Sequence, residues 1–170
     1  EFNTIQAGAN NVGTPTTWVF ATEPSAQAVV EYKGLKMVCT GDYKRRRDPT
    51  CRQFEPVPDT HVFISEATFG LPVFKHPDTD GEIRKLLDSV ALFPDRTHLV
   101  GVYALGKAQR VIKLLREAGY NETLYIHGAL EKLCQLYEDH GVALGPLETA
   151  TLDTKERGAQ EWFRGKIVLG

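Results

Sequence analysis

The sequence has no membrane-length apolar run, no paired cysteine spacing and no general excess of positive charge. No apolar stretch approaches the roughly 20 residues of a membrane-spanning helix, and the first four residues lack the character of a secretory signal. Three cysteines, none of them in a CxxC spacing, favour buried and reduced thiols. We therefore expect a cytoplasmic protein with no membrane partner.

The charge and the composition exclude two further classes of protein. The net charge of −2 excludes a globally basic nucleic-acid binder, although a local basic groove is still compatible with it. Hydrophobic residues make up 42% of the chain and charged residues 25%, which is typical of a globular rather than a disordered protein. The 170 residues are enough for one ordinary domain or two small ones.

The early part of the sequence predicts a small group of strands. Residues 1–27 carry weak signals and are dominated by Asn, Gly, Thr and Pro. The apolar runs 28–32 and 35–40 flank Lys33-Gly34, which predicts a hairpin. After a loop with three prolines, residues 61–65 predict another strand.

Strands and helices alternate in the later part of the sequence. Apolar residues at helical spacing predict helices between Asp78 and Pro94, at 106–118 and at 129–140. Strands are predicted at 98–103, 124–126 and 166–169, whereas 149–161 is polar and loop-like. This alternation implies right-handed crossovers and a parallel sheet. The chain is therefore expected to be α/β, with a division near residue 72.

An acidic residue follows each of two successive predicted strands. Asp42 comes after the run 35–40, and Glu66 comes after the run 61–65. Because α/β proteins place metal and substrate ligands at the carboxyl ends of strands, the two carboxylates suggest one shared site. A structural interpretation stays open for both residues. Asp42 could accept backbone N–H groups in a turn, and Glu66 could be an N-cap or turn carboxylate that ends its strand.

Four consecutive cations follow Asp42 closely. Lys44, Arg45, Arg46 and Arg47 suit a phosphate clamp, because cations beside a phosphate gain affinity by releasing counterions. The alternative is a solvated loop, which is the usual role of a charge run. Within the run we expect Lys44 to be the most committed to phosphate and Arg47 the least.

A second candidate anion contact lies where a predicted strand joins a predicted helix, in residues 103–109. Exposed N–H groups at the start of the helix, together with Lys107, suit an anion. The segment lacks the spacing of a P-loop, and a plain turn with Gly106 chosen for close packing is the alternative. His127, at the end of the strand 124–126, is interpreted as a cap or structural residue rather than a ligand.

Several of these segments together resemble a known family. GDYKRRRDPTC at 41–51, ISEATFGLPVF at 64–74 and ALGKAQ at 104–109 are similar to motifs of metallo-β-lactamase-fold nucleases that carry a β-CASP domain. Within that family the sequence is most similar to bacterial ligase-associated DNA exonucleases. The resemblance runs from about Ser25 to Leu147.

The resemblance implies a fold that combines part of a metallo-β-lactamase sheet with a β-CASP-like parallel βα domain. Residues 28–72 would form the strands and the metal-ligand loop, and residues 73–148 the β-CASP-like domain. Residues 1–27 stay unassigned, as a discontinuous remnant of the metallo-β-lactamase part. Residues 149–170 would form a polar loop and a final strand.

The resemblance also implies a function and site residues. The function is metal-dependent hydrolysis of DNA phosphodiesters by an exonuclease in DNA repair, with an ATP-dependent DNA ligase as a partner and single-stranded DNA as a substrate. Asp42 would be a ligand shared by two zinc ions, and Glu66 would support the metal site. Lys44, Arg45 and Lys107 would contact backbone phosphate. The alternatives are an RNA-processing nuclease and a non-catalytic domain that binds nucleic acid or acts as a scaffold.

The chain departs from the family at its metal ligands. The HxHxDH motif is absent, no histidine precedes His61, and the later β-CASP histidines are not present. Either the chain is a remnant that cannot hold metal, or segments of a longer protein are missing, for example between Pro24 and Ser25. We favour the second hypothesis, which predicts an intact mass well above 18.9 kDa.

Overall fold

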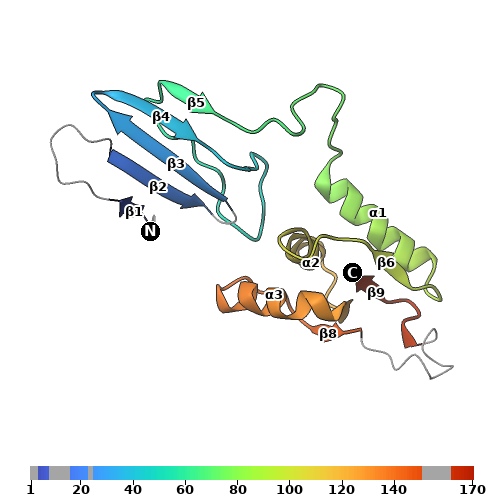
Figure 1. The fold of residues 1–170 in the computed structure, drawn as a ribbon. Coiled ribbons are helices and arrows are strands. Elements are labelled where there is room, and N and C mark those ends of the chain that lie inside the picture. The colour runs from blue at the N-terminus through green and yellow to red at the C-terminus, as the bar shows by residue number, and fades with distance from the viewer. Residues whose placement is uncertain (1–3, 8–15, 23–24, 151–161) are drawn as a thin grey trace. The chain divides into compact units, whose positions relative to one another are not determined.

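A computed structural model describes residues 4–7, 16–22, 25–150 and 162–170 of the chain (Figure 1). The chain divides into two compact units, residues 1–75 and residues 76–170. Within the described residues each unit has its own sheet, the first with five strands and the second with four. None of the helices in the described segments is both long and apolar enough to cross a membrane.

The first unit is a sheet whose five strands lie in the order of the sequence. They are β1 (Thr4–Ala7), β2 (Thr16–Thr22), β3 (Ser25–Tyr32), β4 (Leu35–Cys39) and β5 (Val62–Ile64). Neighbours from β1 to β4 are antiparallel, whereas β5 is parallel to β4. The strands predicted at 28–32, 35–40 and 61–65 are confirmed. In contrast, β1 and β2 lie in the segment whose sequence carried weak signals.

The predicted hairpin joins β3 to β4 through Lys33 and Gly34. Both residues have positive φ, 48° and 79°, which suits the right-handed twist of the flanking strands. The register pairs Val29 with Val38, which are only 2% and 0% exposed. On the same side of the sheet, the amide of Gln27 donates to the Glu55 carbonyl at 3.0 Å. The loop between β4 and β5 therefore covers this face.

The second unit has a four-stranded parallel sheet, as the alternating pattern predicted. Its elements are α1 (Thr79–Leu92), β6 (His98–Val100), α2 (Lys107–Glu117), β7 (Leu124–Ile126), α3 (Gly128–Asp139), β8 (Leu147–Thr149) and β9 (Ile167–Leu169). The strand order is β6-β9-β7-β8, so the last strand in sequence lies inside the sheet. Strand β6 ends before the predicted limit of 103, and β8 was not predicted. Of the predicted loop 149–161, residues 151–161 lie outside the described residues.

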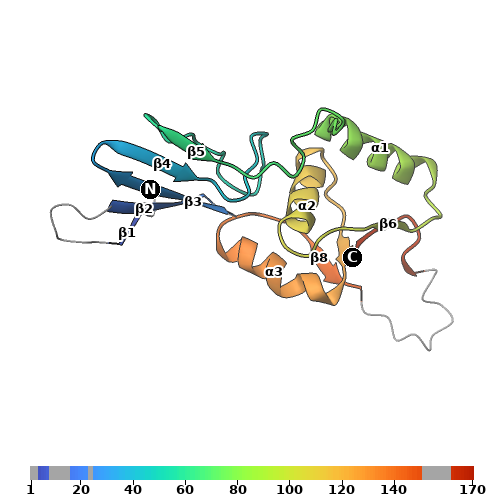
Figure 2. The same cartoon turned by 45° about the horizontal axis from the view of Figure 1, so that its top comes forward.

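The core of the second unit lies between one face of this sheet and the helices. Ile112 and Leu115 of α2 and Leu124 and Ile167 of the sheet are all 0% exposed and belong to one cluster. Helices α2 and α3 lie side by side in both ribbon views (Figure 1 and Figure 2). This arrangement follows from the helical spacing of the apolar residues, which gives each helix one buried side.

In the second unit, side chains form hydrogen bonds with backbone groups at the start of α1 and around the end of α2. Asp78 begins α1 by accepting the Gly81 N–H at 2.9 Å. Arg116 donates to four backbone carbonyls around the end of α2 and the start of β8, at 2.6–2.8 Å. The guanidinium therefore joins loops that are distant in sequence.

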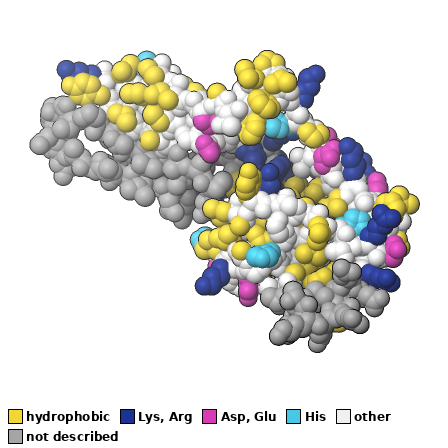
Figure 3. Space-filling model, turned by 45° about the vertical axis from the view of Figure 1, so that its right-hand side comes forward, with side chains coloured by type: hydrophobic (Ala, Val, Ile, Leu, Met, Phe, Trp, Pro, Cys, Tyr) yellow, Lys and Arg dark blue, Asp and Glu magenta, His cyan; other side chains and the backbone are white. Residues whose placement is uncertain are grey.

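Both units also leave large apolar side chains exposed (Figure 3). In the first unit most of these side chains belong to β5 and the segment after it, and two belong to the β3–β4 hairpin: Val62, Phe63, Ile64, Phe69, Leu71, Val73 and Phe74, with Tyr32 and Leu35. In the second unit Leu99 and Trp162 are 78% and 65% exposed. Leu99 pairs with Val168, and Val168 pairs with Tyr125, so these residues occupy the sheet face opposite the helices.

Candidate nucleic-acid interface and acidic site

The register of the first sheet brings the two predicted acidic residues to one edge. Strands β4 and β5 are parallel neighbours, with Cys39 paired to Ile64, and the Thr40 N–H extends the ladder to the Ile64 carbonyl at 3.0 Å. Asp42 and Glu66 each follow within three residues of these paired ends. The two carboxylates thus belong to adjacent carboxyl ends of parallel strands.

The carboxylate of Asp42 is exposed to solvent. Within the part of the chain that the structure describes, no group forms a hydrogen bond or ion pair with its side chain. The turn interpretation required Asp42 to accept backbone N–H groups, and no such bond is present among these residues. The carboxylate is therefore available to a cation or ligand from solution.

The carboxylate of Glu66 is also exposed, but it is bonded within its own turn. Its Oε2 accepts the Thr68 N–H at 2.7 Å, and this hydrogen bond lowers the pKa of Glu66 below its usual range. The bond is the turn role that the sequence left open for this residue. The neighbouring Ser65 Oγ lies 3.3 Å from the Tyr43 hydroxyl, which links the segment after β5 to the segment after β4.

The residues present do not form a zinc centre by themselves. Among the described residues, no three His, Cys, Asp or Glu side chains gather in a group that could hold a metal ion. A zinc site needs three or four protein ligands, and Asp42 and Glu66 offer only carboxylates. The described residues therefore supply carboxylates but not the complete ligand set of the dinuclear zinc centre that the resemblance implies.

An acidic residue directly after the cationic run forms an ion pair with its first member. Asp48 Oδ2 lies 2.7 Å from Lys44 Nζ, and Asp48 Oδ1 accepts the backbone N–H and the hydroxyl of Thr50 at 3.0 and 2.7 Å. Burial raises the pKa of Asp48, but the hydrogen bonds from Lys44 and Thr50 outweigh it, so the pKa lies below its ordinary value.

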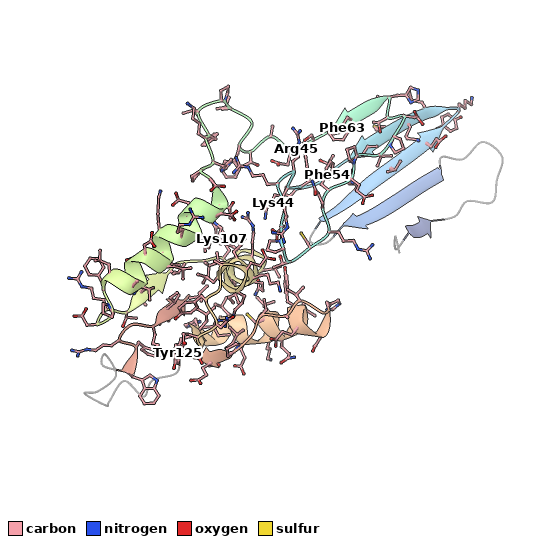
Figure 4. The ribbon with its side chains drawn as sticks, turned by 180° about the vertical axis from the view of Figure 1, so that it is seen from behind. Lys44, Arg45, Phe54, Phe63, Lys107 and Tyr125 are labelled. Atoms are coloured by element: carbon pink, nitrogen blue, oxygen red, sulfur yellow. The ribbon has the colours of Figure 1, made fainter. Side chains whose placement is uncertain are left out.

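The other members of the run have different surroundings. The Arg45 side chain is exposed and makes no hydrogen bond or ion pair within the described residues, whereas Arg46 and Arg47 each take part in an interaction. Beside the run, the Tyr43 and Phe54 rings stack with centroids 4.4 Å apart. Figure 4 shows Lys44, Arg45 and Phe54 in the loop next to β4 and β5.

Backbone N–H groups at the start of α2 in the second unit already form hydrogen bonds within the chain. The Gly106 N–H donates to Gln109 Oε1 at 2.8 Å, and the N–H groups of Lys107 and Ala108 donate to backbone carbonyls at 3.0 and 3.1 Å. The N–H groups that were expected to face an anion are thus already bonded. The Lys107 side chain itself is exposed, with Nζ 4.9 Å from the centre of the Tyr103 ring.

His127 has the structural role that the sequence favoured. It precedes α3, and its Nδ1 accepts the Ala129 N–H at 3.2 Å as a helix cap. The sequence analysis missed Asp48, which directly follows the predicted run of four cations and organises the loop of residues 40–61 between β4 and β5, called the cationic loop below. The spacing of four residues from Lys44 to Asp48 was a signal that could have indicated the ion pair.

No protein-family model matches the chain. Comparison with known proteins finds distant relatives whose names refer to DNA ligation or RNA cleavage. The chain is 31% identical over 154 residues to a probable DNA ligase of Opitutus terrae, a match that covers 85% of this chain. It is 30% identical over 95 residues to cleavage and polyadenylation specificity factor 73 of Drosophila melanogaster, and 32% identical over 95 residues to endoribonuclease YSH1 of Saccharomyces cerevisiae. Each of these two matches covers 55% of this chain.

The chain corresponds to a small part of each of these relatives. It spans 14% of the ligase, 14% of the cleavage factor and 12% of the endoribonuclease. Distant homologues of the chain thus include proteins named for DNA ligation and for RNA cleavage.

Proposed function

We propose that the chain belongs to the β-CASP nucleases of the metallo-β-lactamase fold and takes part in hydrolysis of nucleic-acid phosphodiesters. The observation that carries the proposal is the pairing of β4 with β5, which puts Asp42 and Glu66 at one sheet edge next to a cationic loop. The motifs at 41–51 and 64–74 support the family, and so do relatives named for RNA cleavage.

The preferred substrate is DNA, and the preferred role is that of an exonuclease in DNA repair. The match that covers the largest share of the chain among the relatives described above is the probable DNA ligase, which supports a link to ligation. An ATP-dependent ligase is the proposed partner, and the cytoplasm the proposed location. RNA processing is the second candidate, because two relatives carry names of RNA cleavage.

The roles proposed for the site residues follow their exposure. Asp42 would act as a metal ligand and Glu66 as a supporting carboxylate, while Lys44, Arg45 and Lys107 would contact phosphate. The proposed zinc ions need further ligands, which we assign to segments of a longer protein. Residues 28–72 would then be the metallo-β-lactamase part and residues 73–148 the β-CASP-like part.

The test compares labelled single-stranded DNA and RNA of one sequence as substrates of the purified protein at its natural length. Progressive shortening of the DNA, with the RNA left intact, is the expected result. Asp42→Asn should lower the rate at least about 100-fold if the carboxylate contacts the reacting centre, and Asp59→Asn in the same loop serves as the matched control. Cleavage of the RNA alone would favour the second candidate, and binding without cleavage of either polymer would favour a scaffold.

A further inference from the structure

The Asp48 carboxylate is held at a fixed position in the cationic loop by hydrogen bonds. Both carboxylate oxygens of Asp48 are bonded, Oδ2 to Lys44 Nζ at 2.7 Å and Oδ1 to Thr50 N and Oγ1 at 3.0 and 2.7 Å. The Asp48 side chain is only 8% exposed, whereas that of Lys44 is 49% exposed. Hydrogen bonds from Thr50 therefore fix the Asp48 carboxylate, and the Asp48 carboxylate in turn fixes the Lys44 ammonium group.

This ion pair differs from an ordinary surface pair. An ion pair between two exposed side chains is weak, because both charges stay well hydrated. Here the carboxylate is nearly buried, and its second oxygen is fixed by the backbone and hydroxyl of Thr50. A charge-assisted hydrogen bond to such a fixed acceptor is stronger than a neutral one. A phosphate that approached Lys44 would have to compete with Asp48.

Arg45 is in the opposite situation. Its side chain is exposed and has no bonding partner within the described residues. Its backbone carbonyl accepts a long hydrogen bond from Gln53 Nε2 at 3.4 Å. Further along the same loop, the buried amide of Gln27 holds the Glu55 carbonyl at 3.0 Å. Among the described residues, the Arg45 guanidinium is thus unpaired, in a loop whose backbone is held to the sheet at Glu55.

We propose that Asp48 is a positioning residue for phosphate binding, which retains Lys44 within the loop and leaves Arg45 as the cation that contacts nucleic acid. The inference rests on the proposed binding of nucleic acid and revises one role within it: of the two loop cations proposed above to contact phosphate, Arg45 keeps that role and Lys44 does not. The partner it requires is the phosphate backbone of a single strand, which suits a planar guanidinium with several donors.

The test measures how the affinity for a labelled single-stranded oligonucleotide depends on salt. Each phosphate contact contributes about 0.7 to the slope of log K against log salt concentration for single strands. Arg45→Met should flatten the slope by about 0.7, whereas Lys44→Met should change it little. Asp48→Asn should steepen it by a similar amount, because Lys44 is released while the amide oxygen still accepts from Thr50. The double variant Asp48→Asn/Lys44→Met should return to the slope of the wild type.

Asp59→Asn is the control for a general loss of negative charge. Asp59 lies in the same loop at φ 54°, a conformation that asparagine also adopts readily. A merely structural role of Asp48 would not steepen the slope beyond that of Asp59→Asn, and such a result would overturn the inference. An unchanged slope in Arg45→Met would overturn it as well. If the wild type shows no salt-dependent binding at all, the proposed binding of nucleic acid fails together with the inference.

Discussion

The two units differ in whether the polar side chains near the ends of their helices and strands have hydrogen-bond partners. In the second unit Gln109, Arg116 and His127 are bonded to backbone groups that would otherwise lack partners. In the first unit Asp42 and Arg45 are exposed without a bonding partner among the described residues. Bonded polar groups stabilise a fold, whereas unpaired charged groups at the surface are available to ligands. The comparison agrees with the proposal that the β4–β5 edge contacts a ligand, whereas these three side chains of the second unit stabilise its fold.

The largest expected effect tests the core of the second unit. Leu115 on α2 is 0% exposed, so Leu115→Ala should lower the free energy of unfolding by about 2–5 kcal/mol through lost burial and a cavity. Urea denaturation followed by circular dichroism measures the change. Leu99→Ala is the control, because Leu99 is 78% exposed and its loss should cost no more than about 0.5 kcal/mol. Equal losses for the two variants would contradict the assignment of the core.

The next effect compares two glycines of the second unit that both have positive φ. Gly165 has φ +68°, and an added Cβ would lie 2.5 Å from the Pro94 carbonyl oxygen. Gly119 has φ +91° and no atom within 4 Å of that position. Gly119→Ala should cost about 1–2 kcal/mol from backbone strain alone, and Gly165→Ala should cost clearly more. Thermal unfolding of both variants measures the two losses of stability. A smaller loss for Gly165→Ala than for Gly119→Ala would contradict the short distance between residue 165 and the Pro94 carbonyl.

A smaller effect tests the structural role of His127. His127→Ala removes the acceptor for the Ala129 N–H and should cost about 1 kcal/mol of stability. His127→Asn supplies another capping acceptor and should recover most of that loss. Nuclease activity on the DNA substrate should be unchanged in both variants. A large fall in activity with normal stability would move His127 into the reacting site.

The smallest effect concerns pH and the cationic loop. The pKa of folded Asp48 lies below its ordinary value of 3.8, so its ionised form favours the folded state. This contribution is fully present above the ordinary value, and it is lost as the pH falls through the lower pKa of the folded state. Asp48→Asn should therefore reduce the difference in unfolding free energy between neutral pH and the acid range below 3.8. The same difference in variant and wild type would argue against the bonded carboxylate.

Regular periodicity made most of the second unit predictable. The spacing of Ile83, Leu86 and Val90 predicted α1, and Asp78 predicted its start. The position of β9 between β6 and β7 was not predictable, because strand order is set by packing between distant segments. Strand β8 is as short as β7, but its sequence Leu-Glu-Thr has a single apolar residue and lacks the apolar run that indicated β7.

The candidate site was predictable in part. Asp42 and Glu66 were placed at carboxyl ends of strands from the sequence, but only the β4–β5 pairing showed that these ends are neighbours. The prediction of an anion site at the start of α2 did not take Gln109 into account. Gln109 lies three residues after Gly106 and accepts the Gly106 N–H. Side chains that compete for backbone N–H groups or for cations are hard to rank from sequence, because their choice of partner depends on the folded loop.

The central claim is tested most directly by the metal content of the protein purified from its natural source, with its intact mass measured on the same sample. The claim predicts about two zinc ions per chain, as in two-metal phosphodiesterases, together with a mass well above 18.9 kDa that includes the missing ligands. A mass of 18.9 kDa without bound metal would contradict it. A domain that binds nucleic acid without cleaving it would then be the better description.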